Sequence, residues 1–308
     1  MPAKIQTFRL EEAIGRKVKS TRGRGVEGEK SPGLNVVQFP IDTGIPEINL
    51  RWGFDQIGDG FFSPRHRHNF DQFRYVVYGE TNIAKGRDLH QGEIGYFPEG
   101  TYYGPLTQRG DVGLLVMQFP GPEGEYRITD DEKQAAMDRL RAKGGVFEDG
   151  IYKITRPDGT KVNQDSYEAV WQEHTGRPVT YAKPRYAAPI MVRPQGFQWR
   201  KHPKHPGVEI KNLGSFHEYG TAISIWRLAP GTVIAPEVLD APEVRCVIAG
   251  ETHYEGRLLD DKSTYYIPEG VRTSPIESPK GAELLVFSLP MYARAAWDKA
   301  HGRETAAA

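Results

Sequence analysis

Short apolar runs separated by turn residues dominate the chain. The runs combine β-branched, aromatic and leucine side chains, which suit the pleated surface of a sheet. This pattern predicts six strands, at Asn49–Phe54, Phe73–Val77, Gly113–Phe119, Ala222–Leu228, Val244–Ile248 and Glu283–Leu289. Glycine and proline, 34 and 23 residues, supply the turns that so many short strands require. We therefore expect an all-β fold with few helices.

Helical periodicity is confined to short segments. The clearest helix is predicted at Asp130–Lys143, where Thr129 and Glu132 carry the signature of a capping box and Gly144 follows the last turn. A short amphipathic helix is predicted at Leu10–Lys17, and another helix at Tyr292–His301. Residues 164–174 are expected to add one or two helical turns.

An internal repeat divides the chain into two similar halves. Gly-Glu-Thr at 79–81 recurs at 250–252, Pro-Glu-Gly at 98–100 recurs at 268–270, and Leu-Leu-Val at 114–116 recurs at 284–286. The same motifs in the same order indicate a duplication. We expect an N-terminal arm at 1–30, a first β domain at 31–125, a helical linker at 126–185, a second β domain at 186–290, and a C-terminal helix and tail at 291–308.

Composition excludes several classes of function. The chain has 40 basic and 40 acidic residues, so it lacks the basic excess of a nucleic-acid binder or of a membrane-surface anchor. Its single cysteine, Cys246, allows no intrachain disulfide and no cysteine-rich zinc site, and we expect it to be buried in the second domain. No run is apolar enough to span a bilayer, and a cytoplasmic protein is expected.

The candidate chemistry lies in the first repeat. His66 and His68 are two residues apart in a β-type segment, so both imidazoles point to the same face of the strand and can share a metal ion. Gln72 can offer a neutral oxygen ligand or hold a metal-bound water, and Arg74 lies on the same face of the next strand. A buried Arg74 needs either an anionic ligand or an internal carboxylate. Candidate carboxylates are Asp71, Glu80 and Glu93.

These residues resemble the cupin superfamily. His66-Arg67-His68, Gln72 and Gly79 are similar to its first motif, and Gly92, Pro98, Gly100 and Tyr103 to its second. The resemblance covers both repeats and implies two tandem double-stranded β-helix (jelly-roll) barrels, that is, a bicupin. Tyr103 stands where a metal-binding histidine is usual, and Gln72 where a glutamate is usual. The resemblance also implies a homodimer.

A narrower resemblance is to the gentisate and hydroxynaphthoate type of bicupin ring-cleaving dioxygenases. It is carried by Pro64–His68 followed by Phe73–Val77, with arginine at position 74. It implies a divalent transition metal held by His66 and His68, with Gln72 or Tyr103 completing the site. Fe(II) is the favoured ion, and Zn, Mn, Ni and Cu are the alternatives. It also implies O₂ and a small anionic substrate, a hydroxylated aromatic carboxylic acid, held by Arg74 and Gln72.

The second repeat lacks the histidine pair. Glu237, Leu239, Glu243 and Thr273 stand in the places of His66, His68, Gln72 and Tyr103, whereas Arg245 repeats Arg74. Carboxylates without imidazoles are a poor transition-metal site, so we expect this barrel to be structural. His202 and His205 are separated by a proline and are expected in a solvated loop, and His90 is expected at the surface.

Three classes of function remain open from the sequence. The first is a metal-dependent dioxygenase. The second is a non-oxidative lyase, isomerase or hydrolase in which the metal acts as a Lewis acid and Tyr102 or Tyr103 as general acid or base. The third is a non-catalytic cupin that binds a small ligand. The metal present after purification, and the ligand affinity of a His66→Ala variant, distinguish among them.

Overall fold

The computed structural model describes residues 4–18, 34–45, 48–121, 128–293, 296–298 and 302. The chain forms two units, and neither is continuous in sequence. One contains Gly15–Gln38 and Asn49–Val192; the other contains Met1–Ile14, Phe39–Ile48 and Arg193–Ala308. The structure thus places the N-terminal strand with the second barrel and the helical segment with the first, which differs from the domain bounds expected above. Residues 19–30 of the expected arm lie outside the described residues.

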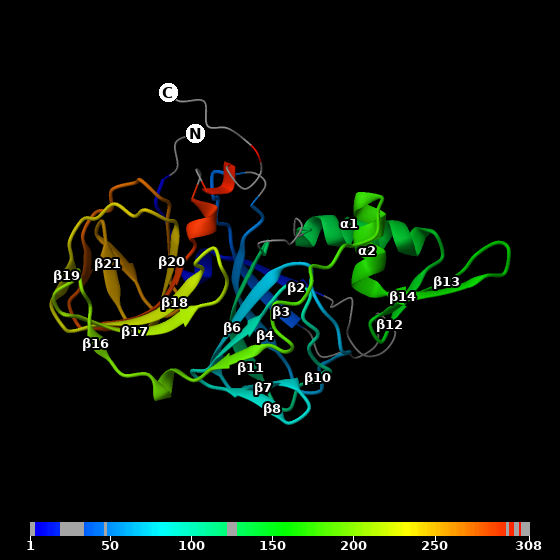
Figure 1. Cartoon of the computed structure of the whole chain (residues 1–308), viewed down its shortest axis with the longest axis horizontal. Helices are drawn as coiled ribbons and strands as arrows, with labels where there is room; N and C mark the ends of the chain where they lie inside the picture. The colour runs from blue at the N-terminus through cyan, green and yellow to red at the C-terminus, as the bar shows by residue number, and fades with distance from the viewer. Residues whose placement is uncertain are drawn as a thin grey trace. The chain divides into compact units, whose positions relative to one another are not determined.

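The first barrel is built around a seven-stranded sheet with the strand order β15-β9-β6-β11-β4-β3-β2 (Figure 1). Two small sheets, β10-β5 and β7-β8, belong to the same unit. The strands are β2 (Ile14–Val18), β3 (Leu34–Phe39), β4 (Arg51–Ile57), β5 (Phe62–Ser63), β6 (Asp71–Tyr78), β7 (Glu80–Ala84), β8 (Arg87–His90), β9 (Ile94–Phe97), β10 (Leu106–Thr107), β11 (Val112–Phe119) and β15 (Ile190–Val192).

The second barrel repeats this order as β1-β23-β20-β25-β18-β17-β16, beside a four-stranded sheet β19-β24-β21-β22. Its strands are β1 (Gln6–Phe8), β16 (Arg200–Lys201), β17 (Val208–Ser215), β18 (Ala222–Leu228), β19 (Thr232–Ile234), β20 (Glu243–Gly250), β21 (Thr252–Tyr254), β22 (Arg257–Leu259), β23 (Thr264–Ile267), β24 (Ile276–Ser278) and β25 (Ala282–Ser288). The one-turn helices η1 (Leu10–Glu12), η2 (Pro194–Gly196) and η3 (Pro290–Tyr292) flank them.

The repeated strand order confirms two tandem barrels. Arg74 pairs with Gly95 and Val116 in the first sheet, and Arg245 pairs with Tyr265 and Val286 in the second. The partners of Arg245 follow those of Arg74 by the same number of positions as the repeated motifs do. The duplication therefore preserves the strand register as well as the sequence motifs.

The helical segment after β11 packs with the first barrel. It contains α1 (Asp130–Ala142), a three-stranded sheet of β12 (Val146–Glu148), β13 (Ile151–Thr155) and β14 (Lys161–Asp165), and α2 (Ser166–Thr175). The predicted capping box is confirmed: Thr129 Oγ1 accepts from the Glu132 amide at 3.1 Å, and Glu132 Oε2 accepts from the Thr129 amide at 2.7 Å. Both helices and β13 share one apolar cluster, which also includes Phe70 of the barrel.

The helix predicted at Leu10–Lys17 is wrong. Only Leu10–Glu12 forms a single helical turn, and Ile14–Val18 forms β2 at the edge of the first sheet. So short a helix has little stability of its own, and pairing with a sheet edge outweighs the weak local pattern. Half of the helix predicted at Tyr292–His301 lies outside the described residues; residues 296–298, which are described, are helical.

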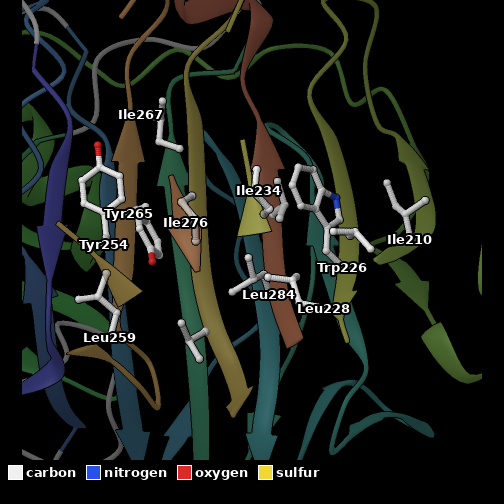
Figure 2. Packing of buried hydrophobic residues seen from close by; sticks show 13 residues of the cluster. Ile210, Trp226, Leu228, Ile234, Tyr254, Leu259, Tyr265, Ile267, Ile276 and Leu284 are labelled. Carbon is white, nitrogen blue, oxygen red and sulfur yellow. The ribbon is translucent and has the colours of Figure 1, made fainter. Parts of the chain in front are cut away.

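The core of the second barrel is closely filled. Figure 2 shows Trp226, Ile234 and Tyr265 among the apolar side chains of its interior. The first barrel carries Asp55, Ser63 and Gly95 at the positions that correspond in the repeat. Asp55 and Ser63 line a cavity in the first barrel, whereas the space beside Gly95 is filled by the side chains of Leu89 and Phe97.

Candidate functional site

His66 and Tyr103 face each other in an antiparallel bridge of the first barrel. The His66 amide donates to the Tyr103 carbonyl at 3.0 Å, and the Tyr103 amide donates to the His66 carbonyl at 2.9 Å. Directly paired residues present their side chains on the same face, and His68, two residues further along, shares that face. The backbone pairing therefore brings one phenol and two imidazoles together.

The side chains converge on the Tyr103 hydroxyl. Its oxygen lies 2.8 Å from His66 Nε2 and 3.2 Å from His68 Nε2. Arg74 Nη2 donates to the same oxygen at 3.2 Å. The His66 Nδ1 atom lies 2.6 Å from the Pro64 carbonyl, which can only accept a hydrogen bond. A neutral His66 therefore carries its proton on Nδ1 and turns the lone pair of Nε2 toward Tyr103.

A cavity of about 180 Å³ lies beside this group. Its polar side is formed by Ser63, His66, His68, Gln72, Arg74 and Tyr103. Leu114 and Val116 of β11 form part of its apolar side, and Phe70 lines it next to His68. The helical segment contributes Ile128, Asp130, Lys133 and Tyr167, so this segment forms part of the wall of the site.

Arg74 has no carboxylate partner among the residues that the structure describes. Its side chain is buried, at 9% exposure, and no ion pair within 4.0 Å involves it. The carboxylates named as candidate partners bind elsewhere: Asp71 accepts from Tyr96 Oη at 3.0 Å, and Glu93 accepts from the His90 amide at 3.1 Å. Within the described part of the chain, Arg74 Nη1 has no hydrogen-bond partner.

Gln72 connects Arg74 to the rest of the barrel interior. With its amide oxygen turned to the guanidinium, Gln72 accepts from Arg74 Nε at 2.9 Å and from Nη2 at 3.0 Å. The other end of its amide lies 2.6 Å from Gln118 Nε2. Gln72 thus orients Arg74 but leaves its positive charge uncompensated.

The comparisons with known proteins concern the fold. No protein-family model and no curated protein sequence matches the chain. A candidate dioxygenase from Nostoc punctiforme is 12% identical, with a TM-score of 0.61 over 94% of this chain and 84% of the other. HEPD from Streptomyces albus, with its substrate 2-hydroxyethylphosphonate and Fe(II) bound, is 13% identical, with a TM-score of 0.57 over 98% and 79%. Oxalate decarboxylase from Lactobacillus farciminis, in a formate complex, is 13% identical, with a TM-score of 0.50 over 95% and 88%.

Together with the repeated strand order, these similarities decide the fold. The chain folds as a bicupin. At such low identity the similarity extends to the fold alone, so the function of this bicupin has to be argued from its own residues.

The second barrel of the bicupin provides a direct contrast. Arg245 is fully buried, like its counterpart Arg74, but it donates from Nη2 to Glu237 and from Nε to Glu243, both at 2.8 Å. These two glutamates occupy the positions of His66 and Gln72. In the second barrel the chain supplies two carboxylates of its own, whereas in the first barrel the same positions are neutral.

His205 differs from the expectation of a solvated loop. It is 7% exposed, and its Nε2 lies 3.4 Å from Glu237 Oε2. Its ring stacks on that of His202, with centroids 4.4 Å apart, and both pack near Trp226. The proline between them does not prevent this, because a tight loop rather than a regular strand holds the two rings together. His90 is exposed, and Cys246 is buried, as predicted; burial raises the pKa of the Cys246 thiol to about 12.

The structure brings together five of the six predicted site residues: His66, His68, Gln72, Arg74 and Tyr103 all line the cavity. Tyr102 does not. Its side chain is 41% exposed and lies under the guanidinium groups of Arg65 and Arg67. Successive residues of an extended segment point to opposite faces, so Tyr102 and Tyr103 cannot both reach the cavity.

The wall that the helical segment forms could not be predicted from the sequence. Phe70 stacks on His68 with ring centroids 4.3 Å apart, and Tyr167 of α2 meets both rings. Asp55, which also lines the cavity, pairs with Arg51 inside the barrel. Strand alternation could have placed Asp55 inside the barrel, but no local signal reports the docking of α2.

The donor atoms at Tyr103 fit a metal ion. Two donors bound to one ion at roughly 2.0–2.1 Å lie about 3 Å apart, which matches the distances from Tyr103 Oη to the two imidazole nitrogens. The Pro64 carbonyl fixes the His66 tautomer that a metal ligand needs. Among the described residues, no group of three or more His, Cys, Asp and Glu side chains is placed to hold a metal ion. The Tyr103 phenol would therefore be the third protein ligand, since the amide oxygen of Gln72 is turned to Arg74.

Within the described part of the chain, no helix has the length and hydropathy needed to cross a membrane.

Proposed function

We propose that this bicupin is a metal-dependent enzyme whose first barrel binds a small carboxylic acid. The observation that carries the proposal is the combination of two imidazole nitrogens directed at one oxygen and a buried arginine without a carboxylate. The first feature suits a transition metal, and the second suits an anionic ligand. Both lie in the same cavity.

The anionic part of the substrate belongs at Arg74. A buried guanidinium without a counter-charge is unfavourable, and a ligand carboxylate would remove that penalty. Arg74 Nη1 is the nitrogen that lacks a partner in the described residues, and it is the donor available to such a ligand. Gln72, hydrogen-bonded to Nε and Nη2, would hold the guanidinium plane in place. The formate complex of one structural neighbour and the phosphonate substrate of another are consistent with a small anion in this fold.

The metal would be held by His66 and His68, with the Tyr103 phenol as an oxygen ligand, because the amide oxygen of Gln72, the other candidate, accepts two hydrogen bonds from Arg74. Imidazole suits Fe, Mn, Ni, Cu and Zn, and we favour Fe(II), the ion that is bound in the HEPD structure. Fe(II) would supply the activation of O₂, which is the chemistry expected of a dioxygenase acting on a hydroxylated aromatic acid.

The protein's own groups have distinct tasks in this proposal. Arg74 and Gln72 bind and orient the carboxylate. Without a metal the Tyr103 hydroxyl donates to His66 Nε2 and accepts from Arg74; with Nε2 bound to a metal, the hydroxyl would instead be free to hold a proton toward the ligand. Phe70, Leu114, Val116 and Ile128 line the apolar side of the cavity and limit the access of water.

Oxygen uptake with Fe(II) tests the proposal. Purified protein is loaded with Fe(II) and mixed with hydroxylated benzoates, and O₂ consumption is followed with an electrode. We expect turnover that depends on O₂ and on the carboxylate, and its loss in His66→Ala and Arg74→Met variants. If the protein consumes the benzoate equally fast in anaerobic buffer, it is not a dioxygenase.

One observation favours a second candidate, a non-oxidative lyase, isomerase or hydrolase. The absence of a third His, Cys, Asp or Glu ligand in the described residues leaves the metal weakly bound. An ion acting only as a Lewis acid tolerates weaker ligation, and Tyr103 would then be the general acid or base. Copurification of zinc, nickel or manganese, together with turnover in anaerobic buffer, would support this candidate instead.

A further inference from the structure

The helical segment between the two barrels contacts the candidate site through one residue in particular. Tyr167 of α2 is 7% exposed and lines the cavity. Its hydroxyl donates to Asn69 Oδ1 at 2.7 Å, and Asn69 is fully buried. Asn69 directly follows His68 in the chain, so the bond connects α2 to the backbone beside a candidate metal ligand.

Ring contacts connect the same residues a second time. The His68 imidazole stacks on Phe70 with centroids 4.3 Å apart and an interplanar angle of 21°. Tyr167 meets Phe70 edge to face, at 6.4 Å and 74°, and lies 6.3 Å from the His68 ring. Phe70 and Tyr167 also belong to the apolar cluster that joins α1, α2 and β13. The imidazole is thus held from the side by a group that is itself fixed in the core of the helical segment.

The second barrel indicates that this arrangement is not needed to close a barrel. Leu239, Asp240 and Ala241 stand in the places of His68, Asn69 and Phe70. The backbone is otherwise the same, because the Gly270 amide donates to the Leu239 carbonyl at 2.9 Å as the Gly100 amide donates to the His68 carbonyl at 2.7 Å. Among the described residues after β25 there are only the turn η3 and the helical residues 296–298. In the part of the chain that the structure describes, the aromatic contacts and the helical segment accompany the histidine pair.

We propose that Tyr167 is a positioning residue for His68, and that the helical segment serves the site of the first barrel. Tyr167 would fix the turn at Asn69 through its hydroxyl and the imidazole plane through Phe70. Residues that orient a metal-binding histidine commonly change metal affinity by about 10–100-fold when they are replaced. The inference rests on the proposed function in so far as His68 binds a metal. The orientation of the His68 ring by Tyr167 and Phe70 is a property of the metal-free protein.

The test compares Tyr167→Phe with Tyr152→Phe. Tyr152 belongs to the same apolar cluster and does not line the cavity, so its variant controls for the general effect of a Tyr→Phe change in the helical segment. Each protein is titrated with Co²⁺, and the visible absorption of the bound ion is recorded. We expect Tyr167→Phe to weaken Co²⁺ binding about tenfold and to change the spectrum. Tyr152→Phe should do neither, and the melting temperatures of the two variants should be similar.

A second measurement separates failure of this inference from failure of the proposed function. The ¹⁵N resonances of the His68 ring, identified with a His68→Gln variant, are recorded without metal. A shift in Tyr167→Phe that is absent in Tyr152→Phe supports the positioning role even if wild-type protein binds no Co²⁺, in which case the metal proposal fails alone. If both variants change the affinity and the resonances equally, or if neither changes them, Tyr167 is not a positioning residue.

Discussion

At the scale of single residues, the two barrels differ most clearly in how they treat the same buried arginine. Arg245 has two carboxylates at 2.8 Å, and Arg74 has an amide oxygen and a phenol. Buried charges are favourable only when they are paired and hydrogen-bonded. The charge of Arg245 is therefore compensated within the fold. The charge of Arg74 is not, and an anionic ligand would compensate it.

This difference predicts opposite responses to one substitution. Arg245→Met would leave Glu237 and Glu243 without their counter-charge, and we expect it to lower the free energy of unfolding by about 3–5 kcal/mol. Arg74→Met removes an uncompensated charge, and we expect a change within about 1 kcal/mol together with the loss of carboxylate binding. Urea denaturation of both variants, without ligand, measures the two values. Similar losses in the two variants would mean that Arg74 is as well compensated as Arg245.

The candidate site could be predicted at this scale because strand alternation is a local property. The spacing of His66 and His68 puts both on one face, and the resemblance to the second cupin motif points to Tyr103. The amide of Gln72 and the lack of a carboxylate at Arg74 could not be derived, because they depend on cross-strand neighbours. Tyr167 and Phe70 could not be found for the same reason, since their contact depends on how α2 docks.

At the scale of elements, the loop at residues 202–207 makes the stability of the second barrel depend on pH. Burial, and then the neighbouring His205, lowers the pKa of His202 to about 4. Burial raises the pKa of Glu237, but its hydrogen bond with His205 and the charge of Arg245 outweigh this effect and hold its pKa at about 2. Both groups therefore bind protons less readily in the folded protein than in the unfolded chain.

Stability should consequently fall as the pH falls. The contribution of His202 is complete above its ordinary pKa of 6.5 and is lost toward pH 4. That of Glu237 is complete above 4.5 and is lost toward pH 2, which we expect to lower the free energy of unfolding by about 2 kcal/mol. Urea denaturation at a series of pH values measures the effect. A Glu237→Gln variant should show a shallower dependence between pH 4.5 and 2 than the wild type, and an unchanged slope in that variant would refute the assignment.

The N-terminal strand shows where local sequence was insufficient. The segment at Leu10–Lys17 has a weak helical pattern, but most of it forms β2 beside β3 in the first sheet, and the strand just before it pairs with the second sheet. β1 pairs with β23 through Gln6 and Tyr266, and Arg257 Nη1 donates to the Thr7 carbonyl at 3.0 Å. An ion pair between Glu12 and Arg257 adds a second link. The first residues of the chain thus complete the sheet of the second barrel.

Removing these residues should affect one sheet only. In a variant that lacks residues 1–12, the β23 edge loses its partner strand, and we expect faster amide hydrogen exchange at Thr264–Ile267. Ile94–Phe97, the corresponding strand β9, keeps its partner β15 and should exchange as in the full-length protein. Exchange measured by mass spectrometry on peptides from both strands gives the comparison. Equal protection of β23 in the two proteins would mean that β1 contributes no stable pairing.

At the scale of the whole molecule, the duplication is strict in strand order and relaxed in chemistry. The sequence repeat was sufficient to predict two barrels, because turn motifs such as Pro98–Gly100 and Pro268–Gly270 keep the same spacing. It could not predict the discontinuous units, because β1 and β15 lie outside the repeated motifs. Trp226 and Tyr265 fill the interior of the second barrel (Figure 2), which also holds internal carboxylates. The first barrel keeps a cavity with a polar side.

This division predicts one metal ion per chain rather than two. The imidazole pair is present only in the first barrel, and the corresponding Glu237 is engaged by Arg245. Ligand at about 100 times its dissociation constant stabilises the state that binds it by about 2.7 kcal/mol, which corresponds to a rise in Tm of about 5–10 °C for a unit of this size. Elemental analysis should give a single equivalent in the wild-type protein and none in His68→Ala, and EDTA should lower the Tm of the wild type only. Two equivalents, or the same Tm with and without EDTA, would show that the histidine pair of the first barrel is not the metal site, because the stabilisation must follow the ion that this barrel alone can hold.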